Sequence, residues 1–370
     1  MKSVFKSATE EQKSRYTNLL GMFASMSRLY SNSDKPYLDY RTAEKCFITA
    51  FDAADYTRSC VAIDAKVGTI GVGIKTFVDT PFQKIAEFDE KSHVLNGDPE
   101  HDARAIAVLR NERMELARDA YGITDFIYHY ILRTKGQMSI HEEPMLFIDI
   151  DRIRIIKARK QNFDFTDGHC TYRFSRSKST LYKKFDWSDP LAFIGVAILD
   201  DIIDQLEATF GVINMEEPIP EIAESVILPL FSTRGGRHVP ERSGLNQWNA
   251  KGRPRDPNEV YIPLPVSIKK KHEDFFPERK VHFSLVLPDG QSLDASVCQD
   301  NGKAIMSNPN SDLGRWILRT VLKLEPRELV TIDKLDDLGI DAVVFTKYED
   351  HYKIDFTYIG DGRDEEDDGL

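Results

Sequence analysis

The pattern of apolar residues changes at one place in the chain, and this change limits the folds that the sequence can adopt. In the first part, apolar residues recur at helical spacing over long segments, with strand-like runs between them. In the last part, the apolar runs are short and are separated by turn residues. Between them lies MEEPIPEIAESVILPL (215–230), which contains three prolines. We therefore predict two domains, 1–225 and 226–360, followed by an acidic flexible tail at 361–370.

The two predicted domains differ in class. In the first, helical spacing is found at 10–32, 40–51, 81–88, 100–121 and 189–210. Strand-like runs lie at 60–64, 70–78, 126–134, 145–156 and 169–185. Helices around a central mixed sheet make this an α/β (α+β) domain. The second domain has short strand-like runs and one clear helix, RWILRTVLKL (315–324), which predicts an all-β domain, a small barrel with little helix.

Charge is distributed unevenly along the chain. The net charge of −11 argues against nucleic acid as a partner, but the tail DGRDEEDDGL alone has six acids and one arginine. Residues 234–271 contain nine Lys or Arg and three acids. An acidic protein can bind DNA through one such basic stretch.

The sequence also constrains where the protein works. The start, MKSVFKSATEEQKSRY, is too polar for a signal peptide, and no apolar run approaches the roughly 18 residues of a membrane span. The four cysteines lie far apart without a CxxC pair. This spacing argues against zinc ribbons and disulfide frameworks, and it favours a reducing cytoplasm.

Two candidate catalytic residues lie in a predicted β-hairpin. CVAID and IGVGIKTFV flank a turn at 66–68, so Asp64 ends the first strand and Lys75 lies within the second. A carboxylate that holds Mg²⁺ beside a lysine that assists a water is typical of metal-dependent phosphodiesterases. Glu44, on the helix before the hairpin, is a further carboxylate for this site.

One acid of this pattern is missing. Such sites usually have a second acid two residues before the lysine, and that position is Gly73. Glu87 follows Lys75 by twelve residues, on the helix predicted after the second strand, and a helix packed back on its parent strand returns a side chain to the strand's end. The alternative for Glu87 is a solvated helix residue.

A competing assignment uses a different lysine. Asp64-Ala65-Lys66 itself fits an acid-x-lysine pattern, with Asp52 or Asp55 as the upstream acid. We rank it lower because Lys66 falls at the predicted turn, where a solvated lysine is expected. Other nuclease and hydrolase motifs are absent: HxKxxxxD is incomplete, no GIY precedes TYIG, and neither a P-loop nor GxSxG occurs.

The basic stretch RGGRHVPERSGLNQWNAKGRPRDPNEVYIPLPVSIKKK combines residue types that contact DNA. Arg, Asn and Gln recognise guanine and adenine edges through paired hydrogen bonds. Lysines in a cluster such as 269–271 suit phosphates, which contribute affinity rather than sequence choice. A solvated charged loop is the alternative interpretation.

The second domain resembles the B3-like DNA-binding domain of type II restriction endonucleases. RSGLNQWNAKGRPRDPNEVYIPLP, FFP (275–277), QDNGKAI (299–305) and LGRWIL (313–318) carry the resemblance, in this order. It implies a pseudobarrel that grips duplex DNA in the major groove with an N-terminal arm at 242–249 and a C-terminal arm at 299–303. The DNA-binding residues expected on this basis and from the basic stretch are Arg242, Ser243, Asn246, Gln247, Trp248, Asn249, Arg253, Arg255, Lys270, Gln299, Asp300, Asn301 and Lys303.

The first domain resembles the PD-(D/E)xK nuclease fold. In several restriction endonucleases of that fold, a glutamate about a dozen residues after the lysine replaces the lost strand acid. The resemblance implies that Asp64 and Glu87 bind Mg²⁺ with the help of Glu44, and that Lys75 activates the water. RSKSTLYKK (176–184) is a candidate phosphate-binding segment beside this site.

Both resemblances imply one function. We expect a type II site-specific deoxyribonuclease that hydrolyses double-stranded DNA with Mg²⁺, acts as a homodimer on DNA and has no membrane partner. The rival hypothesis is a non-enzymatic, sequence-specific DNA-binding protein whose first domain oligomerises or recruits a partner.

Overall fold

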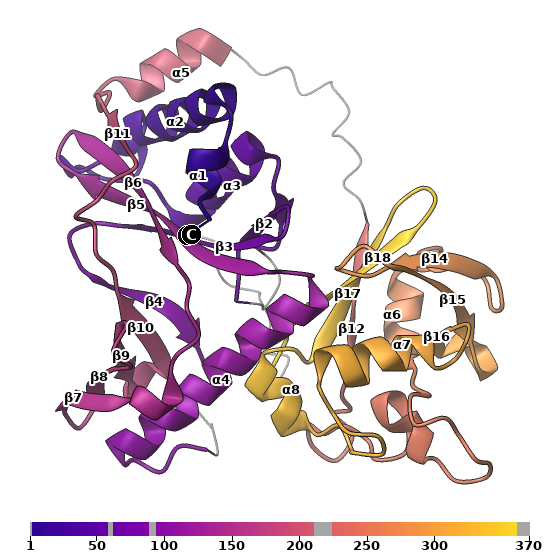
Figure 1. Ribbon diagram of the computed structural model, residues 1–370. Coiled ribbons are helices and arrows are strands. Elements are labelled where there is room, and N and C mark those ends of the chain that lie inside the picture. Colours follow the sequence, from indigo (N-terminus) through magenta and orange to yellow (C-terminus); the bar gives the residue numbers. More distant parts are fainter. Residues whose placement is uncertain (1, 58–61, 89–93, 211–223, 361–370) are drawn as a thin grey trace. The chain divides into compact units, whose positions relative to one another are not determined.

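The computed structural model describes residues 2–57, 62–88, 94–210 and 224–360 (Figure 1). The chain clusters into two compact units. Among the described residues, the first consists mainly of those up to residue 210, and the second contains 224–360 together with the helix end at 115–122. Each unit is described by itself.

The first unit contains a six-stranded mixed sheet with strand order β1-β2-β3-β5-β6-β11. Neighbouring strands are antiparallel except β3 and β5, which are parallel and are connected through a long helix, α4. The strands are β1 (Ala54–Asp55), β2 (Ala65–Val67), β3 (Ile70–Phe77), β5 (Asp125–Thr134), β6 (Gln137–Pro144) and β11 (Ala192–Gly195). The predicted hairpin is confirmed, but its turn is at Gly68 and Thr69 instead of 66–68, because Lys66 and Val67 belong to β2.

Helices cover one face of this sheet. They are α1 (Val4–Ser7), α2 (Glu10–Ser25), the short 3₁₀ turn η1 (Ser27–Leu29) and α3 (Tyr40–Phe51). The helix predicted at 40–51 is confirmed residue for residue. Asp39 caps its first turn by accepting from the Thr42 N–H at 3.0 Å, and Asp52 ends it in the left-handed region with φ 51°. Its apolar face packs against Val72 and Ile74 in the core below.

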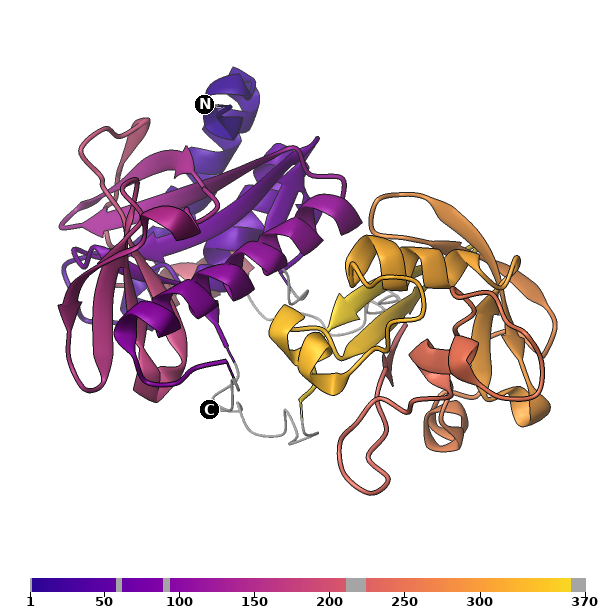
Figure 2. The ribbon, with the colours of Figure 1, turned by 60° about the horizontal axis from the view of Figure 1, so that its bottom comes forward.

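A second, antiparallel sheet of five strands completes the first unit, in the order β4-β10-β9-β8-β7. Its strands are β4 (Phe82–Glu87), β7 (Arg154–Ala158), β8 (Asn162–Thr166), β9 (Thr171–Ser175) and β10 (Thr180–Lys184). Helix α4 (Pro99–Ala120) lies along one face of this sheet (Figures 1 and 2), where Ile106 and Ala107 meet Phe163 and Phe174. The 3₁₀ turns η2 (Ile150–Arg152) and η3 (Arg176–Lys178) lie in its connections.

Two helix predictions in the first unit are wrong. Residues 82–87 form β4, because their backbone pairs with β10 and the Phe82 ring lies 4.1 Å from the Arg173 guanidinium. Six residues are too few to separate the 3.6-residue period of a helix from the two-residue period of a strand. The segment 189–210 contains strand β11 and only then a helix, α5 (Ile202–Phe210).

The second unit contains seven strands in the order β12-β17-β18-β14-β15-β16-β13. The first and last strands of this order approach each other, so the sheet forms a nearly closed barrel, as predicted. The strands are β12 (Ser225–Pro229), β13 (Ile262–Pro263), β14 (His282–Val286), β15 (Ser292–Cys298), β16 (Ala304–Ser307), β17 (Ala342–Lys347) and β18 (Tyr352–Thr357). Because β12 begins at Ser225, the last part of the predicted linker is a strand; 211–223 and the tail lie outside the described residues.

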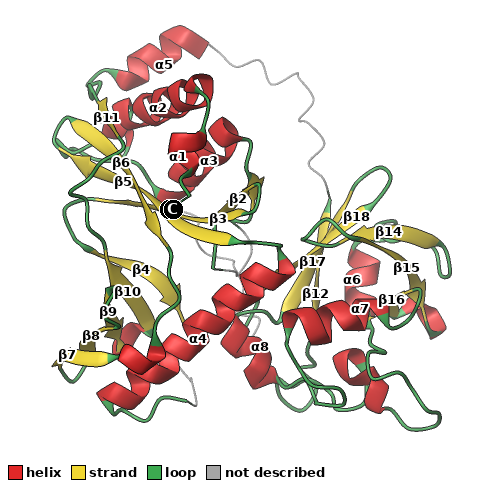
Figure 3. Cartoon of the chain, in the orientation of Figure 1, coloured by secondary structure: helices red, strands yellow, loops and turns green. Residues whose placement is uncertain are grey.

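Helices accompany this barrel (Figure 3). The predicted helix at 315–324 is present as α7 (Asp312–Gly314) continued by the π-helical η6 (Arg315–Val321). The sequence did not predict α6 (Val266–Lys271), α8 (Ile332–Leu338) or the 3₁₀ turns η4 (Gly244–Asn249) and η5 (Asp300–Gly302). The second unit is therefore less purely β than expected. In neither unit does any described helix combine the length and the apolar character that crossing a membrane requires.

Candidate functional site

Asp64 and Lys75 meet at the edge of the hairpin, as the sequence predicted. The Asp64 N–H donates to the Val72 carbonyl at 2.8 Å, which fixes this residue just before β2 begins. Its Oδ2 accepts a hydrogen bond from the Ile74 N–H at 2.6 Å and another from Lys75 Nζ at 3.1 Å. The Asp64 carboxylate thus accepts the backbone hydrogen bond from Ile74 that a carbonyl of a neighbouring strand would otherwise accept.

Lys75 is held but not enclosed. Its Nζ also donates to the Ile74 carbonyl oxygen at 2.9 Å. The side chains of Lys75 and Asp64 are 26% and 24% exposed. A charged pair at this depth is fixed in geometry and still open to a ligand, in contrast to a sealed ion pair of the core.

Glu44 lies close enough to this pair to respond to its charges. The residue is on α3, next to the buried face, and is 8% exposed. Burial, and then the negative charge of Asp64, raise the pKa of the Glu44 carboxyl to about 7. The Lys75 ammonium acts in the opposite direction, and Asp55 adds a smaller repulsion. Three of the four predicted catalytic residues therefore gather in one place.

The oxygen donors of this place suit a hard divalent cation. Mg²⁺ is commonly bound by one or two carboxylates, with waters and substrate phosphates completing its shell. Glu44 and Asp64 provide two carboxylates whose repulsion a cation would relieve. No cluster of three or more acids, histidines or cysteines suited to a metal occurs among the described residues.

Glu87 does not have the surroundings that its predicted role needs. It ends strand β4 in the five-stranded sheet, where it pairs across to Thr180. Its side chain is 61% exposed and accepts from Lys84 Nζ at 2.8 Å. The expectation that a helix returns Glu87 toward Lys75 is wrong, because no helix follows β3: a strand at about 3.3 Å per residue extends away instead.

The space above Gly73 is filled. A Cβ at this position would lie 2.6 Å from Met145 Cε and 3.1 Å from the Tyr128 ring. Tyr128 and Met145 are in turn fixed by Arg110, which donates to the Tyr128 hydroxyl at 3.2 Å and contacts Met145 Sδ at 3.3 Å. The position of the missing strand acid has thus become part of the packed interior.

Lys66 of the competing assignment does not lie where the sequence predicted. Lys66 lies on β2 opposite Gly71 and not in the turn. Asp55 is on β1 opposite Ala65, where its carboxylate accepts from Thr57 and pairs with Lys45 at 3.4 Å.

In the second unit, Asn246 is an internal residue. It is fully buried in η4. Its amide Nδ2 donates to the carbonyls of Pro240 at 3.2 Å and Val330 at 3.0 Å, and its Oδ1 accepts from the Val330 N–H at 2.9 Å. Each of these bonds stays inside the unit, so the expectation that Asn246 contacts a base edge is corrected: the residue fastens the loop to the barrel.

The neighbours of Asn246 differ in exposure. Arg242 is exposed and has no ion pair among the described residues. Asn249 donates to the Glu241 carbonyl at 2.9 Å. Trp248 is half-buried, with an indole N–H that is buried and has no partner in the described part of the chain. Ser243 and Gln247 are half-buried.

Two predicted DNA-binding arginines are engaged by a buried acid that the sequence analysis did not single out. Glu259 is 4% exposed, and both of its carboxylate oxygens accept from Arg253 Nη2, at 2.7 and 3.0 Å. Arg255 pairs with the same carboxylate at 3.2 Å and donates to the Ala250 carbonyl at 2.8 Å. The side chain of Arg253 is still 55% exposed, whereas that of Arg255 is 13% exposed. Arg255 therefore stabilises the loop conformation, whereas the side chain of Arg253 remains partly accessible to a ligand.

The predicted C-terminal arm is a tight loop between β15 and β16. Gln299 and Asn301 have positive φ of 61° and 62°, which non-glycine residues adopt rarely and mostly where surrounding structure enforces it. Lys269 Nζ donates to the Asn301 carbonyl at 3.3 Å, so the lysines of α6 lie beside this loop. Asp300, Lys303 and Lys270 are exposed there.

The second unit matches a family model of a DNA-binding domain. Residues 224–349 match the family model of the NgoFVII C-terminal B3-like DNA-binding domain. The second unit is therefore similar to the B3-like DNA-binding domain of a restriction enzyme, and this similarity supports DNA as its partner. The match covers the barrel from just before β12 to just after β17 and does not extend into the first unit. Comparison with curated proteins gave no match for this chain.

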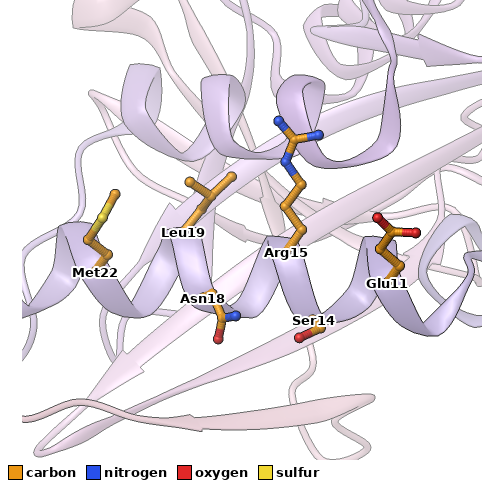
Figure 4. Close-up of a pocket in the computed structure, with 6 residues that line it drawn as sticks. All are labelled: Glu11, Ser14, Arg15, Asn18, Leu19 and Met22. Atoms are coloured by element: carbon orange, nitrogen blue, oxygen red, sulfur yellow. The ribbon is translucent and has the colours of Figure 1, made fainter.

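Two surface features of the first unit were not predicted. The run RIRIIKARK (152–160) contains five basic residues and no acid, and this charge run was a signal available in the sequence. A shallow pocket also lies along α2, where Figure 4 shows its lining side chains. They are Glu11, Ser14, Arg15, Asn18, Leu19 and Met22. None of them belongs to the predicted catalytic or DNA-binding sets.

Proposed function

We propose that this protein is a Mg²⁺-dependent, sequence-specific endonuclease of the restriction type that hydrolyses double-stranded DNA. The B3-like domain selects the sequence, and the first unit cuts. The observation that carries the proposal is the Asp64–Lys75 contact of 3.1 Å, with Glu44 close enough for its pKa to be raised by Asp64, in a chain that also has a DNA-binding domain.

The geometry supports a division of labour among the three residues. Asp64 and Glu44 would hold the Mg²⁺, which when bound supplies Lewis-acid chemistry and lowers the pKa of water. Lys75 is oriented by hydrogen bonds to Asp64 and to the Ile74 carbonyl, which hold its ammonium at this site. There it would position the attacking water and stabilise negative charge that develops on the phosphate.

The second unit supports sequence selection by two kinds of side chain. Arg242 is exposed, and its guanidinium group can donate two hydrogen bonds to the edge of a guanine base. Lys270 and Lys303 are exposed beside the strained loop at 299–303 and suit phosphates. Asn246 and Arg255 would hold the loop that presents Arg242 and Arg253.

We further propose that the chain acts as a homodimer on DNA in the reducing cytoplasm. Two antiparallel strands require two active sites or two successive cuts. The described cysteines, Cys46, Cys170 and Cys298, are free, which agrees with a reducing compartment.

One observation favours a second candidate, a DNA-binding protein that does not cut. Met145 and Tyr128 occupy the space over Gly73, so the site has no acid at that position, and a side chain there would have to displace the Met145 methyl group. In this alternative, the Asp64–Lys75 pair is only a structural contact at a sheet edge.

Plasmid cleavage separates the two candidates. The purified protein should linearise or fragment plasmid DNA with Mg²⁺ and remain inactive in EDTA. Sequencing the ends of the products would then give the cleavage position. Binding of one duplex sequence with no cleavage at any Mg²⁺ concentration would favour the second candidate, and cleavage that persists in EDTA would exclude the metal-dependent mechanism.

A further inference from the structure

The outer edge of the five-stranded sheet is basic in a chain that is acidic. Its last strand, β7, lies within the run 152–160, which holds Arg152, Arg154, Lys157, Arg159 and Lys160 without an acid. All five are exposed. In the described residues, only Arg152 of these five forms an ion pair, with Asp149 at 3.4 Å. The other four charges are available to a ligand.

A β-bulge turns two of these side chains to the same face. Strand register pairs Arg154 with Thr166 and Lys157 with Asp164, with the irregularity between Ile155 and Lys157. Strand alternation alone would put residues three apart on opposite faces. The extra residue restores the outward direction of Lys157, which is the effect that bulges have on side-chain aim. Ile155 keeps its place against the core.

The outward face of this sheet has no helix in the described structure, because α4 packs on the other face. Its acids are largely engaged: Asp164 accepts from Arg173 at 2.7 and 2.9 Å, and Glu87 accepts from Lys84. Lys184 is exposed on the same face. The face therefore presents unpaired cations with few competing anions.

Arg176 joins a further turn to this edge. Its guanidinium donates to the Arg159 carbonyl at 3.3 Å and to the Gly97 carbonyl at 2.9 Å, and its backbone N–H donates to the Gln161 carbonyl at 2.8 Å. These bonds hold the 3₁₀ turn η3, which carries the exposed Lys178, against the turn that carries Arg159 and Lys160. The basic residues of two hairpins thus form one surface, which we call the β7 edge: Arg154, Lys157, Arg159, Lys160 and Lys178.

We propose that the β7 edge is a second DNA-binding surface, which contacts the phosphate backbone of duplex DNA independently of base sequence. The physical reason is charge complementarity: the five residues of β7 at roughly 3.3 Å each extend over about 16 Å, which several successive phosphates span, and Arg159 and Lys160 add charge at its end. The surface lies entirely in the first unit, outside the B3-like domain, and it does not depend on the chain being a nuclease.

The same basic residues could instead protect the exposed edge strand. Exposed edge strands often carry lysines and a bulge to prevent pairing with another sheet. That role requires charge at the edge but no affinity for a polyanion. DNA binding under varied salt distinguishes the two, because each phosphate contact contributes a slope of about 0.9 in a plot of log K against log salt.

The experiment uses the full chain and a fluorescently labelled duplex of mixed sequence, titrated at several salt concentrations. The test variant combines R154Q, K157Q and K160Q. Its matched control combines K6Q, K13Q and R15Q, which remove the same charge from α1 and α2, on the other sheet. We expect the test variant to weaken binding at least about tenfold at low salt and to reduce the slope by roughly 2–3, with little change in the control.

Equal changes in DNA affinity and salt slope in both variants would mean that only net charge matters. No change in either variant would mean that the β7 edge protects the sheet and does not bind DNA. Each result overturns the proposal. Thermal unfolding of each variant checks the fold. If the triple variant unfolds, R154Q and K160Q alone carry the test, each with an expected slope change of about 0.9.

Discussion

Two polar regions looked equally functional from the sequence, and the structure uses them differently. At the hairpin edge, Asp64 and Lys75 contact each other, and their side chains remain partly exposed. In the loop of the B3-like domain, Asn246 and Arg255 turn inward and bond to backbone carbonyls. The difference is the scaffold: strands dictate where side chains lie, whereas an irregular loop needs its own polar residues to satisfy its backbone.

The largest expected effect tests the hairpin edge. Lys75→Ala should lower plasmid cleavage on the order of 10²–10³-fold while DNA binding is retained, because the ammonium acts on charge that forms in the transition state. Lys66→Ala is the matched control from the competing assignment and should cut normally. Single-turnover cleavage and a binding titration measure both. A cleavage loss in Lys66→Ala with a normal Lys75→Ala would reverse the assignment.

The next prediction compares two glutamates. Glu44→Gln keeps the size of the side chain but removes one carboxylate from beside Asp64, so cleavage should fall on the order of a hundredfold or more. Glu87→Gln should cut at nearly the wild-type rate, since its partner is Lys84 on an exposed strand. Isothermal titration with Mg²⁺ provides a readout separate from activity. Loss of cleavage in Glu87→Gln alone would restore Glu87 as the second ligand.

The third prediction contrasts the two roles within the DNA-binding loop. Asn246→Ala should destabilise the protein by about 2–3 kcal/mol, because it leaves buried backbone groups of Val330 unpaired. Arg242→Ala should leave stability unchanged and cost roughly 1–3 kcal/mol of binding, mainly on the preferred sequence. Urea unfolding and binding to matched and altered duplexes measure these effects. The contrast fails if Asn246→Ala unfolds normally or if Arg242→Ala weakens all sequences alike.

The smallest expected effect is a pH dependence centred on Glu44. Its folded pKa of about 7 lies above the ordinary value of 4.5. Folding therefore favours the protonated form: this stabilisation is complete below about pH 4.5 and is lost as pH rises through about 7. Metal-free urea unfolding of wild type and Glu44→Gln should diverge across this range, with wild type falling relative to the variant. Mg²⁺ affinity of the wild type should rise with pH over the same interval. Parallel stability curves for the two proteins would contradict the raised pKa.

The elements that could be predicted are those with strong local signals. The helix 40–51 has a cap at Asp39, a continuous apolar face and a clear end, and it formed as predicted. The hairpin with Asp64 and Lys75 has apolar runs around a glycine turn, and it placed both residues together. The segments 82–87 and 189–210 have weaker periodicity, and pairing with distant strands decided them.

The amino-acid sequence by itself determined the two-part organisation, the B3-like character of the second part, and which acid and lysine meet across the hairpin. These features depend on residue order and on spacing within about a dozen positions. Only the tertiary structure decided that Met145 fills the space over Gly73, that Asn246 is buried and that the β7 bulge turns Lys157 outward. The physical reason is that each of these depends on packing between segments distant in the chain or on strand register, and local residue patterns do not encode either.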